Sequence, residues 1–171
     1  MSVKLTDLFI ADIDREAPLT RRALERVPEG KPDWKPHPKS MPLGYLSSLV
    51  AMMPSWLTME IEQDEFDLRP ASGTPSKFAQ KLDTVDALVT TMDEGFAGAR
   101  QALQGTTDAH LMKPWQLKVA GNVVMEAPRH VMLRDALMHL SHHRGQLTVY
   151  LRLNDIAVPA IYGPSADDQR F

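Results

Sequence analysis

The sequence contains 171 residues, of which 43% are hydrophobic and 24% are charged. These proportions are typical of a globular domain and exclude a disordered or fibrous chain, so we expect a single domain over residues 1–171. The 19 Lys and Arg and 22 Asp and Glu give a formal net charge of −3, and the basic residues form no long block, so nucleic-acid binding is not expected.

The first segment has a helical pattern. Between Leu5 and Val27, apolar residues recur at three- and four-residue steps, which predicts a helix over residues 5–27. Pro18 lies inside this segment and removes a backbone donor, so we expect it to kink or split the helix. Three prolines between residues 32 and 38 then predict an ordered crossing loop, with Trp34 as its anchor.

Two further helices are predicted in the middle of the chain. One covers residues 41–64, with Ser40 as its N-cap and a bend at Pro54, and a loop follows it over residues 66–74. The other covers residues 76–104, where apolar residues recur in near-heptad steps from Phe78 to Leu103. Glycines in this segment would let a neighbouring helix approach closely.

The pattern changes after residue 104. From Trp115 to Met125 apolar and polar residues alternate around a Gly-Asn pair, which predicts a short hairpin or another extended excursion. Pro128 then opens a last helix over residues 129–153, and a tail broken by Pro and Gly follows it. Together these elements predict an all-α fold, a four-helix bundle with a short hairpin inserted before the last helix.

The last helix carries a pair of histidines at the spacing of a metal site. His139 and His143 lie one turn apart on one face, and His142 points away from both. Leucine and alanine share the face of the pair, so we expect both imidazoles to face the interior. Two hydrogen-bonded core histidines are the alternative, but each buried ring nitrogen needs a partner, which favours a metal-site origin. The chain has no cysteine, so N and O ligands would hold any metal.

Several motifs resemble one protein family. The run HLSHHRGQLTVYLRL at residues 139–153, followed by VPAIYGPSAD at residues 158–167, is similar to the C-terminal signature of the DinB/YfiT-like family. So are Lys39-Ser40-Met41 and Leu43-Gly44-Tyr45-Leu46, and the Pro54-Ser55-Trp56 motif. The resemblance covers most of the chain and is most specific at the C-terminal signature. It implies a small helical bundle, commonly a homodimer, with a metal held by three histidines.

The resemblance assigns two of the three ligands. His139 and His143 match the family's pair, but the first histidine of the pattern falls on Leu49. A leucine cannot coordinate a metal, and Glu60 lies eleven positions further on, about 16 Å along a helix axis. No sequence pattern assigns His110 or His130 as a replacement. We therefore expect zinc or nickel, the divalent metals considered, to bind weakly or not at all.

Two classes of function follow from the resemblance. The first is a metal-dependent S-transferase for a low-molecular-weight thiol, or a hydrolase, with a weakened or remodelled site. The second is a non-catalytic bundle in which Leu49 fills the former site. The sequence assigns no catalytic residue, and it lacks the Gly-x-Ser-x-Gly elbow of serine hydrolases. We also expect a homodimer, a small-molecule partner, a cytoplasmic location, no signal peptide and no membrane span.

Overall fold

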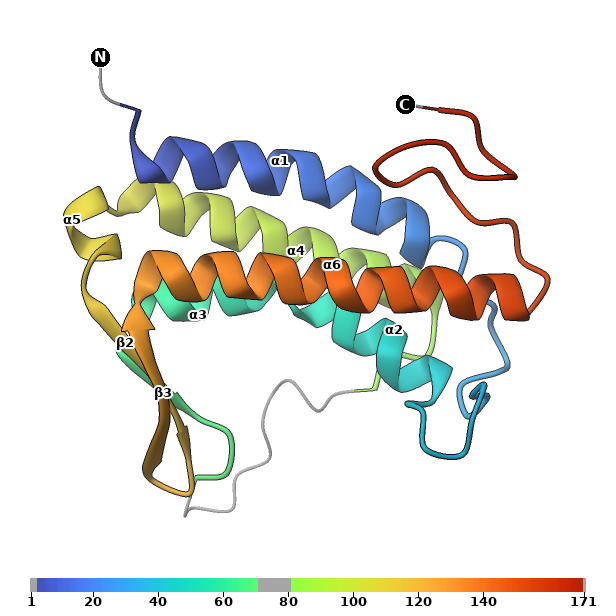
Figure 1. Cartoon of the computed structure of the whole chain (residues 1–171), viewed down its shortest axis with the longest axis horizontal. Helices are drawn as coiled ribbons and strands as arrows, with labels where there is room; N and C mark the ends of the chain where they lie inside the picture. The colour runs from blue at the N-terminus through green and yellow to red at the C-terminus, as the bar shows by residue number, and fades with distance from the viewer. Residues whose placement is uncertain (1–2, 71–80, 171) are drawn as a thin grey trace.

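The computed structural model describes residues 3–70 and 81–170. Within these ranges the chain forms six helices and three strands (Figure 1). In chain order they are α1 (Leu5–Leu24), α2 (Leu43–Met52), α3 (Pro54–Glu62), β1 (Glu65–Asp67), α4 (Val85–Gly105), α5 (Asp108–Leu111), β2 (Pro114–Val119), β3 (Asn122–Pro128) and α6 (Arg129–Leu153). No helix among the described residues is long and apolar enough to cross a membrane.

The long helices lie side by side and bury one apolar core. Helices α1, α4 and α6 run lengthwise, and α2 and α3 follow one another along them (Figure 1). The apolar stripes of the sequence face this core, because Leu24, Leu46, Leu88 and Leu133 are almost fully buried. At Gly95 an added Cβ would lie 3.0 Å from the Pro54 side chain, so this glycine allows the close approach of α4 to α3.

The helix predicted over residues 41–64 is two helices. It is divided at Met53, with Pro54 in the first turn of α3, because a proline cannot donate the backbone hydrogen bond that would continue α2. The prediction that Ser40 caps this helix is wrong, because α2 begins after Pro42 and no side chain caps it. In contrast, α1 continues through Pro18 without splitting.

The helix predicted over residues 76–104 begins later. Residues 76–80 lie outside the described residues, and α4 starts at Val85. Thr84 caps it, because its hydroxyl oxygen accepts a hydrogen bond from the backbone N–H of Ala87 at 3.2 Å. Before this cap, Leu82 is buried without helical structure, and its N–H donates to the Ser48 hydroxyl at 3.0 Å.

The predicted hairpin is present and belongs to a larger sheet. Strands β2 and β3 pair antiparallel around Ala120 and Gly121, which both have positive φ, as tight hairpin turns require. Strand β1, predicted as part of a loop, pairs parallel with β2. The Asp67 carboxylate fixes this pairing, since it accepts hydrogen bonds from both turn N–H groups. The fold is therefore helix-rich with a three-stranded sheet, rather than strictly all-α.

Candidate functional site

An apolar pocket of about 590 Å³ opens between the helices and the sheet. Helices α2, α3 and α6 form one part of its wall, and the three strands form the other. The side chains that line it are mostly aromatic, aliphatic or thioether groups: Tyr45, Leu49, Trp56, Met59, Glu60, Phe66, Leu68, Trp115, Leu117, Met125, Met132, Asp135, Ala136 and His139. Volume and composition are those of a small-molecule site. We call it the apolar pocket.

The two predicted histidines meet at the rim of this pocket. His139 Nε2 and His143 Nε2 are 2.8 Å apart, and His143 Nδ1 lies 2.8 Å from Gln146 Oε1. Since Oε1 can only accept, His143 donates from Nδ1 and accepts at Nε2 the hydrogen bond that His139 donates. His142 is exposed and accepts a hydrogen bond from the Gln146 side-chain amide at 3.0 Å. Each of the three rings thus has a hydrogen bond at Nε2, and the ring of His143 has a second one at Nδ1.

The burial of the pair differs from the prediction. His143 is buried, but His139 is exposed, because the pocket leaves open space beside its ring. Trp56 packs edge-on against His139, with 5.7 Å between ring centroids. Partial desolvation and then the neighbouring His143 and His142 lower the pKa of His139, which keeps this imidazole neutral near pH 7.

The donor set of this site does not fit a metal ion well. Leu49, which the resemblance aligns with a third histidine, lines the same pocket as His139, and its side chain offers no donor. Within residues 3–70 and 81–170, no group of three His, Asp or Glu side chains is placed to hold a metal. The other two histidines considered, His110 and His130, hydrogen-bond the backbone carbonyls of Ile61 and Leu111.

Glu60 is the residue of this pocket whose importance the sequence did not reveal. It is only 5% exposed, and its Oε2 has no hydrogen-bond partner in the described part of the chain. Desolvation, reinforced by the nearby Asp135 carboxylate, raises the pKa of Glu60 to about 8. In the sequence, the only indication of this role was that Glu60 lies on the apolar face of its helix. Trp115 Nε1, also buried, likewise has no acceptor among the described residues.

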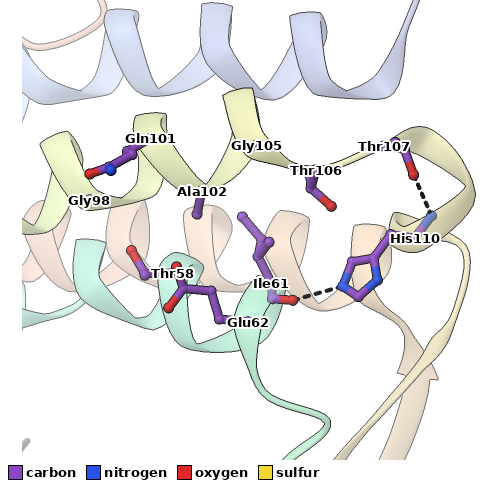
Figure 2. Close-up of a pocket in the computed structure, with 10 residues that line it drawn as sticks. All are labelled: Thr58, Ile61, Glu62, Gly98, Gln101, Ala102, Gly105, Thr106, Thr107 and His110. Carbon is purple, nitrogen blue, oxygen red and sulfur yellow. Dashed lines mark hydrogen bonds between the residues drawn. The ribbon is translucent and has the colours of Figure 1, made fainter.

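A second cleft, of about 700 Å³, lies between α3, α4 and α5. Its lining mixes apolar and polar groups, and Thr58, Glu62, Gln101 and Thr107 are among the polar ones (Figure 2). The one imidazole in this lining, that of His110, already lies 2.8 Å from the Ile61 carbonyl oxygen (Figure 2). Because Glu62, Gln101 and Thr107 are exposed to water, this cleft presents no desolvated group for a ligand to satisfy.

Comparison with known proteins gives consistent results. The model of the DinB family matches residues 1–170. The uncharacterized protein YrdA of Bacillus subtilis strain 168 is 40% identical over 43 residues, so the match spans 25% of this chain and about a quarter, 26%, of YrdA.

Two crystal structures of DinB-like proteins share the fold. One, from Bacillus cereus ATCC 10987, superposes with a TM-score of 0.68 at 20% identity, over 90% of this chain and 95% of that protein. The other, YjoA from Bacillus subtilis, has a TM-score of 0.65 at 17% identity, over 95% of this chain and 99% of that protein. At these identities the likeness establishes the fold.

Proposed function

The chain belongs to the DinB family, and we propose that within this family it is a small-molecule-binding protein whose ligand occupies the apolar pocket. One observation carries the proposal: His139 and Leu49, which the resemblance aligns with two of the family's three metal ligands, both line this pocket. Position 49, which the resemblance assigns to a metal ligand, is therefore part of an apolar wall that a bound small molecule can contact.

The pocket has the features of a binding site for a small organic molecule. Its volume, about 590 Å³, is within the range of sites that enclose drug-sized ligands. Trp115 and Met132 are buried at its base, where they pack with Met59 in a cluster separate from the main core. A few polar groups interrupt this apolar lining, and such groups usually orient the ligand.

Metal-dependent chemistry is the second candidate. Two converging imidazole nitrogens at a pocket rim favour it, and the thiol S-transferase and hydrolase activities implied by the resemblance would use a metal there. Catalytic zinc sites normally have three protein ligands, however, and this site supplies His139 and His143 alone among the described residues. We therefore propose weak metal binding and rank ligand binding without a metal first. The thiol partner and the homodimer remain predictions.

Titration with the neutral fluorescent dye Nile red tests the proposal. We expect saturable binding with one dye per chain, because the pocket offers a desolvated apolar volume. Leu49→Trp, which adds bulk to the wall of the pocket, should weaken binding several-fold. Val149→Trp is the matched control, because Val149 is an exposed apolar residue of α6 that does not line the pocket. Absence of saturable binding, or equal losses in the two variants, would contradict the proposal.

A further inference from the structure

Glu60 is a buried acid, and one oxygen of its carboxyl group has no hydrogen-bond partner among the described residues. Its carboxyl group lies on the wall of the apolar pocket, and Oε2 is unpaired within the part of the chain that the structure describes. Buried polar groups in native proteins are almost always hydrogen-bonded, because an unpaired one loses its interaction with water and gains nothing. The burial of an unpaired carboxyl oxygen on the wall of a cavity is therefore explained best by a ligand group that pairs with it.

The charges around the pocket indicate the sign of that group. The lining contains two carboxyl groups, Glu60 on α3 and Asp135 on α6, and neither forms an ion pair among the described residues. The other titratable groups that face the pocket are Tyr45 on α2 and His139 on α6; the described lining includes no Lys or Arg. The described lining therefore presents two carboxyl groups and no lysine or arginine to balance them.

The aromatic lining points to the same chemistry. Four aromatic side chains from α2, α3, β1 and β2 surround the pocket: Tyr45, Trp56, Phe66 and Trp115. Aromatic faces carry partial negative charge and attract cations, most strongly where water is excluded. Methionine and leucine side chains fill the remaining wall and suit an apolar body.

We propose that the apolar pocket selects ligands that combine an apolar body with a protonated amine, and that Glu60 is the counter-ion of the ammonium group. This inference rests on the proposed function and names its ligand class. An anionic ligand would be repelled by the Asp135 carboxylate, and the lining, as far as the structure describes it, offers no cation to such a ligand. A neutral ligand with a carbonyl group could accept a hydrogen bond from a protonated Glu60, but it would gain no electrostatic attraction from the Asp135 carboxylate.

Binding of an amine also has a consequence for protons. In the empty pocket Glu60 holds its proton near neutral pH, because burial raises its pKa to about 8. An ammonium group beside the carboxyl favours the ionised form, so binding should expel that proton. Amine binding at pH 7 should therefore release close to one proton per chain, whereas binding of a neutral analogue should release none.

Three probes of nearly equal shape test the inference by calorimetry at pH 7: 4-phenylbutylamine, 4-phenylbutanol and 4-phenylbutyrate. We expect the amine to bind most tightly. Glu60→Gln should weaken amine binding by about tenfold to a hundredfold, as expected for loss of a charge-assisted hydrogen bond, and should leave the alcohol unchanged. Glu62→Gln is the matched control, because Glu62 lies on the same helix but is exposed and faces the polar cleft. Titrations in two buffers of different ionisation enthalpy measure the proton release.

The outcomes separate this inference from the proposed function. Equal affinity for amine and alcohol, or an unchanged amine affinity in Glu60→Gln, would overturn the inference while the pocket still binds ligands. Binding of Nile red without binding of the amine would do the same. Failure of every probe, Nile red included, would overturn the proposed function as well. If Glu60→Gln folds poorly by circular dichroism, Asp135→Asn replaces it, and it should weaken amine binding by a smaller factor, with no change overturning the inference.

Discussion

Two glutamates are buried in this protein, and their surroundings differ completely. Glu16 of α1 is 8% exposed; its Oε2 forms an ion pair with Arg144 at 2.6 Å and accepts a hydrogen bond from the Tyr162 hydroxyl at 2.9 Å. Arg144 also donates to Thr20 and Tyr162, so the buried charges are enclosed by partners. Glu60 of α3 is 5% exposed, and its Oε2 has no such partner in the described residues.

The difference distinguishes a structural site from a binding site. Arg144 and His143 are adjacent on α6 but lie on different sides of it. Arg144 belongs to the paired network with Glu16, whereas His143 contacts His139, which lines the apolar pocket. On the Arg144 side, Tyr162 of the C-terminal tail completes the network, and the tail packs back over α1 and α6 (Figure 1). On the other side, the wall around Glu60 and His139 stays open as the apolar pocket. A buried acid that is paired with an arginine stabilises the fold, whereas a buried acid without such a partner is available to a ligand.

The largest expected effect is the loss of the paired network. In Arg144→Met the apolar side chain keeps much of the volume, but it leaves the Glu16 carboxylate buried without its cation. Breaking a buried pair in this way costs about 3–5 kcal/mol, which we expect as a lower free energy of unfolding in urea. Arg152→Met is the control, because Arg152 pairs with Asp167 at the surface and should matter little. Equal losses in the two variants would mean that the network does not stabilise the fold.

The second effect is expected at the unpaired glutamate, and its size depends on pH. Burial raises the pKa of Glu60 from 4.5 to about 8. Between these values the folded protein keeps a proton that the unfolded chain has lost, so Glu60 lowers stability as the pH rises, by up to about 1.4 kcal/mol per pH unit. Glu60→Gln should remove this contribution and be the more stable protein near pH 8.

Urea unfolding of wild type and Glu60→Gln across this range measures the effect. The exposed Glu62 provides the control, since Glu62→Gln should retain the slope of the wild type. If wild type and Glu60→Gln show the same dependence on pH, the carboxyl group of Glu60 is better solvated or better paired than the structure indicates.

The smallest effect concerns the histidine pair on the same open side. Leu49→His should strengthen zinc binding by adding a third imidazole to the pocket that His139 lines. The metal-free variant should melt earlier than wild type, because a polar ring replaces apolar volume. Zinc at about 100 times its Kd should return about 2.7 kcal/mol of stability.

Titration calorimetry and melting curves with and without zinc check the histidine prediction, with Leu49→Gln as a polar control that cannot supply an imidazole. Tight stoichiometric zinc in the wild type would reveal a third ligand that we have not identified. No gain in Leu49→His would show that position 49 does not face the pair.

The sequence by itself determined the elements that local patterns specify. Apolar periodicity predicted the start of α1 at Leu5 and the course of α6. Pro128 marked the start of α6, and Gly121 marked the turn of the hairpin. All of these signals act within a few residues. The spacing of His139 and His143 likewise placed both rings on one turn of α6, where they contact each other. The resemblance of the signature correctly identified the family.

Only the tertiary structure decided which polar groups have partners. Strand β1 has three residues, too few for a periodic signal, and exists because β2 lies beside it. Glu16 and Glu60 both lie on apolar helix faces, yet only Glu16 meets an arginine, which comes from a residue 128 positions away. The exposure of His139 depends in the same way on a pocket whose walls come from α2, α3, α6 and the sheet. Burial and pairing arise from contacts between distant segments, and local sequence patterns do not encode them.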